Sequence, residues 1–185
     1  MLRGAAAIFA ACALTACVHS AADTIAAAPG ADVAAVSRPQ NPALMERLVG
    51  DWVLTGTIGG ENVVHDVDAR WVLQGNYVRL NEVSRERDQS GKAAYEAIIY
   101  VGWLDSAQHF VCIWLDNTAV AAPGVTCVAA ASQDALEFEF RDAQGSLMIA
   151  TTFAYHPQSD SWDWRIDNIE NGRASRFADL TLRRR

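Results

Sequence analysis

Residues 48–56 read Leu-Val-Gly-Asp-Trp-Val-Leu-Thr-Gly. A short run that begins at Asn41-Pro42, a suitable helix cap and first helical residue, leads into Gly50. Glycine lets the chain turn sharply off the helix, and Trp52 then opens the first of many strand-like segments. An indole at this point can close one end of a barrel while its N–H finds a partner. The stretch therefore predicts a short helix followed by a closed antiparallel barrel.

The chain after Trp52 alternates apolar and polar residues with period two, and turn residues separate the alternating segments. Regular strands with no helix between them are typical of an all-β meander, and closure into a barrel removes its exposed edges. We expect one domain over residues 41–185, an up-and-down antiparallel β-barrel of about ten strands. The predicted strands are 51–58, 62–73, 77–87, 94–103, 109–116, 125–131, 136–141, 146–155, 161–169 and 174–183.

The N-terminal residues 1–17 have the pattern of a secretory signal, with Arg3 before a short alanine-rich apolar run. Leu14-Thr15-Ala16-Cys17 resembles the bacterial lipobox, which implies that Cys17 becomes an acylated N-terminus. The alternative is ordinary cleavage nearby, with Cys17 a bystander. The alanine-rich residues 18–40 are expected to form a flexible tether. By this resemblance the protein is lipid-anchored in the bacterial cell envelope, and Val18 after the cysteine favours the outer membrane, facing the periplasm.

The composition excludes some partners. The 185 residues carry 15 Lys and Arg against 22 Asp and Glu, a net charge of −7. Nucleic acid and anionic membrane surfaces are bound by basic faces, so neither is an expected partner. Half of the residues are apolar and six are tryptophan, which is enough for a large core or an aromatic pocket.

Two features resemble the calycin superfamily, which includes the lipocalins. The first is Gly50-x-Trp52 after a short helix, with a strand meander that ends in basic residues at Arg183. The second is Gly102-Trp103-Leu104-Asp105 followed by residues 110–116, Phe-Val-Cys-Ile-Trp-Leu-Asp. This pair is similar to a bacterial lipocalin-like family of unknown function, whose members carry Gly-Tyr-Asp and then Tyr-x-x-x-Trp-x-Asp. Here Trp103-Leu104-Asp105 replaces Tyr-Asp.

A more distant resemblance is to nitrobindin, a calycin that binds haem. Its glycine-rich extension of the Gly-x-Trp motif is not matched by residues 53–57. We therefore expect no cofactor and keep haem as the alternative. Metal-ligand spacings, a Gly-x-Ser-x-Gly elbow and a phosphate loop are absent from the sequence, so no metal site is predicted.

Polar residues at inward positions are candidates for ligand contacts. His65 shares one face of its strand with Val67 and Trp71, and an inward imidazole could act as a base or as an anchor for a ligand. The alternative is a core histidine satisfied by a carbonyl group or water. In the strand 94–103 either face could point inward. One choice would bring Glu96 and Tyr100 toward Glu82 or Arg79 of the preceding strand.

Aromatic residues supply a possible pocket wall. The expected ligand contacts are His65, Trp71, Glu96, Tyr100, Trp114, Phe153 and Trp164. Cys112 and Cys127 lie on consecutive strands and are either a cross-strand disulfide or two thiols.

The predicted function is the binding of a small hydrophobic molecule in the barrel, because small barrels can hold one ligand in a mostly apolar lumen. One alternative is a cofactor-independent isomerase or lyase that uses His65, Glu96 and Tyr100 for proton transfer. The other is a structural envelope lipoprotein with a filled lumen. The sequence leaves the ligand, the catalytic status and the oligomeric state open.

Overall fold

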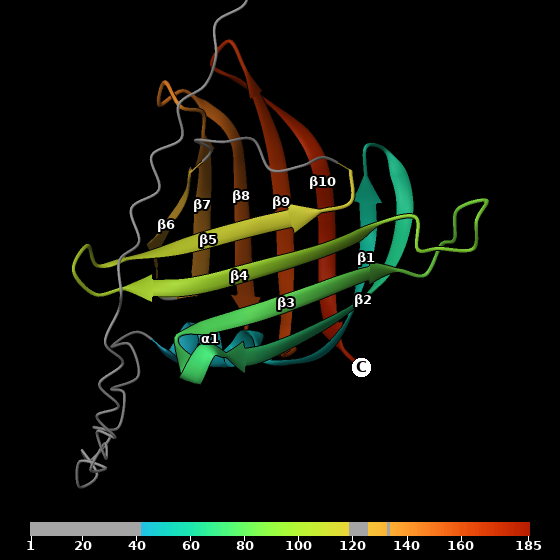
Figure 1. Ribbon diagram of the computed structural model, residues 1–185, viewed down its shortest axis with the longest axis horizontal. Helices are drawn as coiled ribbons and strands as arrows, with labels where there is room; N and C mark the ends of the chain where they lie inside the picture. The colour runs from blue at the N-terminus through green and yellow to red at the C-terminus, as the bar shows by residue number, and fades with distance from the viewer. Residues whose placement is uncertain (1–41, 119–125, 133) are drawn as a thin grey trace, which may run out of the picture. The chain divides into compact units, whose positions relative to one another are not determined.

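The computed structural model describes residues 42–118, 126–132 and 134–185 (Figure 1). The predicted signal (1–17), the lipidation candidate Cys17 and the predicted tether (18–40) lie outside the described residues. Within the described ranges, no helix is long and apolar enough to cross a membrane.

The described residues form one closed antiparallel barrel that follows the chain order, so the predicted fold class is confirmed. Within the part of the chain that the structure describes, a single short α-helix, α1, precedes ten strands, and β1 closes the barrel by pairing with both β2 and β10. The elements are α1 (Pro42–Leu48), β1 (Gly50–Ile58), β2 (Glu61–Val72), the 3₁₀ turn η1 (Leu73–Gly75), β3 (Tyr77–Ser84), β4 (Glu96–Leu104), β5 (His109–Asp116), β6 (Thr126–Ala131), β7 (Ala135–Arg141), β8 (Leu147–His156), β9 (Ser161–Glu170) and β10 (Arg173–Arg184).

The largest departure from the predicted strand bounds is at the end of β3. β3 ends at Ser84, not at residue 87, because local polar contacts take over from the strand ladder. The hydroxyl group of Ser84 accepts the N–H of Glu86, and the Asp88 carboxylate accepts the N–H groups of Ser90 and Lys92. These bonds build the long β3–β4 loop.

The Gly50-x-Trp52 stretch packs against α1. In Figure 1, α1 lies at the end of the barrel where the chain's C-terminus is marked. The buried Trp52 indole donates to the Leu48 carbonyl at 2.7 Å, and the Arg184 guanidinium lies 3.8 Å from the centre of its ring. Arg184 Nη1 also donates to Val49 O at 2.6 Å. A Cβ atom at Gly50 would overlap this guanidinium, so the glycine is required for the arginine to cover the indole.

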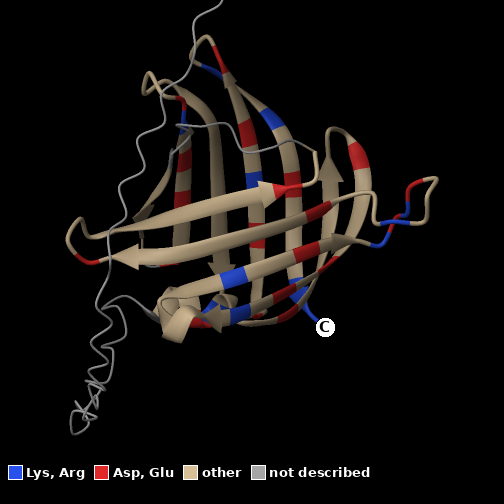
Figure 2. Cartoon of the chain, viewed as in Figure 1, with Lys and Arg blue, Asp and Glu red and all other residues tan. Residues whose placement is uncertain are grey.

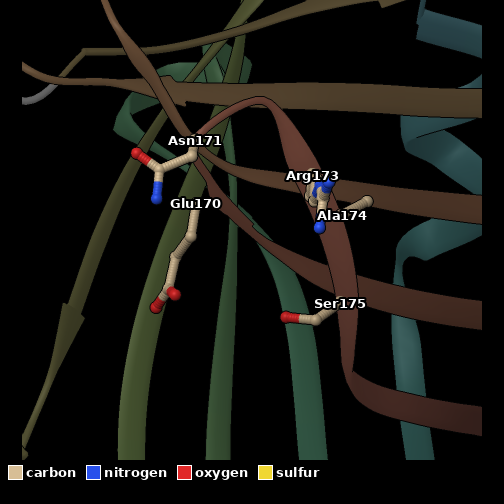
Figure 3. Close-up of a pocket in the computed structure, with 5 residues that line it drawn as sticks. All are labelled: Glu170, Asn171, Arg173, Ala174 and Ser175. Atoms are coloured by element: carbon tan, nitrogen blue, oxygen red, sulfur yellow. The ribbon is translucent and has the colours of Figure 1, made fainter.

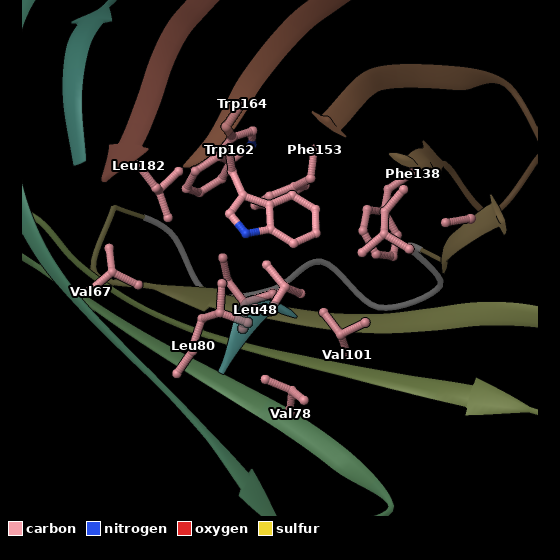
Figure 4. Packing of buried hydrophobic residues seen from close by; sticks show 14 of the residues in the cluster. Leu48, Val67, Val78, Leu80, Val101, Phe138, Phe153, Trp162, Trp164 and Leu182 are labelled. Atoms are coloured by element: carbon pink, nitrogen blue, oxygen red, sulfur yellow. The ribbon is translucent and has the colours of Figure 1, made fainter. Parts of the chain in front are cut away.

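The core consists of inward residues from every strand together with one face of α1. In Figure 4, Trp162, Trp164 and Phe153 face the aliphatic side chains of β2, β3 and β4 across the interior. Aromatic side chains of this size bury the most area per residue, so they dominate the stability of such a core.

The outer face of β2 is charged. Asp66, Asp68 and Arg70 alternate with the inward residues of the strand and pair with residues of β1, of β3 and of the loop after β3. Figure 2 shows acidic and basic positions along β2 and β3. Asp66 pairs with Arg85, Asp68 with Arg79, and Arg70 with Asp51. Because these pairs are partly exposed, water screens them and they add little stability. Their main consequence is that the face of β2 that carries these charges is held toward the solvent, and the opposite face toward the interior.

The seam between β5 and β6 is the shortest strand pairing among the described residues. Its ladder contains two residue pairs, Phe110↔Ala129 and Val111↔Val128. Next to these pairs, Cys112 and Cys127 are joined in a disulfide with a Cα–Cα distance of 5.2 Å. This distance is within the usual range for a disulfide. The covalent link therefore ties β5 to β6 where few backbone hydrogen bonds do so.

Removing the disulfide should destabilise the barrel. The bond spans 15 residues, and closing a loop of this length constrains the unfolded chain by about 3 kcal/mol. The double variant Cys112→Ala/Cys127→Ala should lose about that much free energy of unfolding in urea titrations. A reducing agent should lower the midpoint of the wild type and leave that of the double variant unchanged. Equal midpoints for reduced and oxidised wild type would contradict the expectation.

Candidate ligand-binding site in the barrel interior

The centre of the candidate site is a buried histidine–glutamate pair. His65 on β2 and Glu82 on β3 occupy inward positions of adjacent strands, and each is 2% exposed. His65 Nδ1 lies 2.5 Å from Glu82 Oε1. The second carboxylate oxygen, Glu82 Oε2, is buried and has no hydrogen-bond partner within the described part of the chain. A buried polar atom left without a partner costs about 1–3 kcal/mol, and more when it is charged.

The roles of the imidazole nitrogens depend on the protonation of Glu82. With the Glu82 carboxyl group ionised, Nδ1–H donates to Oε1, and Nε2 of a neutral His65 is left with a lone pair. Nε2 can then accept a hydrogen bond or a proton. Glu82 Oε2 can accept a hydrogen bond from a second donor. The pair is thus suited to hold the polar end of a small molecule.

Tyr95 extends this polar group. Its ring stacks on the His65 ring, with centroids 5.6 Å apart. Burial raises the pKa of the Tyr95 phenol above its ordinary value, and the nearby charges of Glu82 and Asp116 raise it further, while a hydrogen bond from Trp114 acts in the opposite direction. The phenol therefore stays protonated at neutral pH and can donate a hydrogen bond.

Trp114 connects the polar group to an aromatic wall. Its ring lies 5.4 Å from that of Trp164 and 5.9 Å from that of Phe140, and Trp164 stacks on Phe153 at 4.5 Å. Trp164 Nε1 donates to the hydroxyl group of Thr151, which in turn donates to a backbone carbonyl. Since this indole is already satisfied, it presents a largely apolar surface. The interior thus combines aromatic faces with one polar cluster.

The structure brings four of the predicted ligand contacts together: His65, Trp114, Phe153 and Trp164. Glu96 and Tyr100 do not join them. Because β4 points Ala97, Ile99 and Val101 inward, Glu96 is exposed and Tyr100 lies on the outer face. The carboxylate and phenol that meet His65 are instead Glu82 and Tyr95, so the choice of Glu96 and Tyr100 is corrected.

Trp71 is also separate from the cluster. It lies on β2 six residues beyond His65, which is about 20 Å along a strand. There it pairs with Val78 near η1, and its buried Nε1 has no partner among the described residues.

Two carboxylates whose charges act on Tyr95 could have been found by pattern. Glu82 alternates with Val78, Leu80 and Ser84 on the inward face of β3, so the strand period places it in the lumen. Asp116 follows Phe110, Cys112 and Trp114 in the same way on β5. The period-two pattern does not place Tyr95, because this residue lies in the β3–β4 loop just before β4 begins.

A surface pocket of about 460 Å³ lies elsewhere, beside the β9–β10 hairpin. Figure 3 shows its lining residues, Glu170, Asn171, Arg173, Ala174 and Ser175, all of them exposed. It holds neither an aromatic side chain nor a buried charge. We therefore place the candidate site at the His65–Glu82 pair and not at this hairpin.

The described residues contain no group of three or more His, Cys, Asp or Glu side chains that could hold a metal ion. Comparison of the chain with models of protein families and with curated protein sequences found no match. The candidate site therefore rests on its own geometry.

Proposed function

We propose that the barrel binds one small, largely apolar molecule in its interior, beside the His65–Glu82 pair. The observation that carries the proposal is the buried Glu82 Oε2, which lacks a hydrogen-bond partner within the described ranges while Oε1 is held by His65. A bound molecule with a hydrogen-bond donor would supply the missing partner.

The surroundings of Glu82 support the same proposal. Ligand pockets are mostly apolar and contain a few placed polar groups. Here the aromatic rings of Trp114, Trp164 and Phe153 would hold the apolar body of the ligand, and Tyr95 would add a second polar contact.

We propose further that the protein is a lipocalin-like binder held at the bacterial envelope by lipid on Cys17. The lipobox-like residues 14–17 and the Gly50-x-Trp52 stretch support this part. Lipid chains on one residue can hold a protein at a membrane without a transmembrane helix.

Energy transfer from tryptophan to a bound fluorophore tests the proposed site. N-phenyl-1-naphthylamine, a neutral apolar fluorophore with one N–H group, should bind the full-length protein at a ratio of one to one and accept energy from Trp114 and Trp164. The variant Trp114→Phe should reduce the transfer and weaken binding, because Trp114 joins the polar cluster to the aromatic wall.

The matched control is Trp103→Phe, which alters another half-buried indole. Trp103 packs on Phe110 and donates to Asp105 at the β4–β5 turn, away from the cluster. This variant should retain both the transfer and the affinity. Absence of saturable binding, or equal losses in the two variants, would contradict the proposed site.

A further inference from the structure

The barrel interior contains a buried carboxylate but no buried lysine or arginine among the described residues. No described Lys or Arg is buried; all thirteen are half-buried or exposed. The buried ionisable side chains among the described residues are instead His65 and Glu82. With Glu82 ionised and His65 neutral, this pair carries one negative charge. A cation entering the interior is therefore attracted, and an anion is repelled.

The unpartnered oxygen has a defined environment. Glu82 is 2% exposed, its Oε1 is taken by His65, and its Oε2 has no donor among the described residues. A charged donor makes the strongest hydrogen bond to such a carboxylate. A bound ammonium group would satisfy Oε2 and also compensate the buried negative charge.

Aromatic faces complete the site. Tyr95 stacks on His65, and Trp114 lies against Trp164. Ring faces attract cations, most strongly when water is excluded. The same rings offer apolar surface for the remainder of a ligand.

We propose that the molecule bound in the barrel is a small organic cation, an amine with an aromatic or other apolar body, whose N–H group donates to Glu82 Oε2. This inference rests on the proposed function and narrows it from apolar molecules in general to amines. Carboxylates and phosphates are disfavoured because no buried basic residue in the described ranges could receive them.

Three probes of nearly equal size test the class of ligand: 2-phenylethylamine, 2-phenylethanol and phenylacetate. Titration calorimetry on the full-length protein should give the amine the lowest dissociation constant, about tenfold below that of the alcohol, since hydrogen bonds to charged groups exceed neutral ones by roughly that factor. Phenylacetate should bind most weakly.

Glu82→Gln should remove the preference for the amine over the alcohol, because the variant carries no charge at this position. The control is Glu96→Gln, which changes an exposed carboxylate on the outer face of the neighbouring strand β4. This control should keep the preference. The affinities of the wild type for the three probes need no variant. They therefore test the preference for amines even if Glu82→Gln does not fold.

The outcomes separate the two proposals. Equal affinity of the wild type for amine and alcohol, or a preference that survives in Glu82→Gln, would overturn the amine proposal. If N-phenyl-1-naphthylamine binds in the lumen while the amine does not, the amine proposal fails and the proposed function stands. If neither binds, the proposed function fails as well.

Discussion

Replacing His65 by leucine is expected to lower the free energy of unfolding by about 3–5 kcal/mol. The substitution leaves the Glu82 carboxyl group buried without its hydrogen-bond partner, because Oε1 loses the imidazole and Oε2 has no donor in the described residues. Breaking a buried pair from one side is costly for this reason. Urea titration of the variant and the wild type measures the loss.

A double-mutant cycle isolates the pair. Glu82→Met alone should cost less than His65→Leu, since a neutral imidazole loses only one hydrogen bond. The double variant should cost less than the sum of the two, because it leaves no uncompensated charge. Arg85→Gln, which breaks the exposed pair with Asp66, is the control and should change stability much less. Additive costs for His65→Leu and Glu82→Met would contradict the coupling.

Replacing Gly56 by alanine should cost about 3 kcal/mol or more, because its Cβ would have no space at the β1–β10 seam. Gly56 has φ +145°, and a Cβ there would overlap the backbone oxygen of Asp179 and lie 2.8 Å from Leu180 Cα. Backbone atoms of a paired strand cannot move aside as a side chain can. The seam that closes the barrel would have to open.

Gly60→Ala is the matched control. Gly60 also has positive φ, +88°, but a Cβ there would meet nothing within 4 Å. It should therefore cost only the strain of the left-handed conformation, about 1–2 kcal/mol. Thermal or urea unfolding of the two variants measures the difference. Equal costs would show that the close approach of β10 to Gly56 does not limit the barrel.

Period-two alternation was sufficient to predict the number, order and approximate bounds of the strands. β5, expected at 109–116, runs from His109 to Asp116. The pattern fails at the end of β3, because the hydrogen bonds of Ser84 and Asp88 depend on loop geometry and not on period. It also fails to orient β4.

The orientation of β4 could not be predicted because the outer surface there is itself apolar. Ile98 on β4 and Ile113 and Leu115 on β5 are exposed, so hydrophobicity does not distinguish the inner face from the outer one. The error in choosing Glu96 and Tyr100 follows directly. His65, in contrast, lies on a strand whose other face is charged, and its inward position was predictable.

The aromatic wall shows a different limit of sequence reasoning. Phe153 and Trp164 are opposite each other on neighbouring strands, so the register of one hairpin brings them together. Trp114 reaches them from β5, a strand that pairs with neither β8 nor β9, and so only closure of the barrel makes this contact.

The six tryptophans allow the most direct test of a ligand in the lumen beside Glu82. Their indole N–H signals in a ¹H–¹⁵N spectrum, assigned by single Trp→Phe variants, can be followed while 2-phenylethylamine or N-phenyl-1-naphthylamine is added. The signals of Trp114 and Trp164 should shift in a saturable manner. Those of Trp52 and Trp103, which donate to Leu48 O and Asp105, should stay in place. Shifts confined to Trp52 and Trp103, or unchanged signals from all six with both probes, would contradict a ligand site at the His65–Glu82 pair.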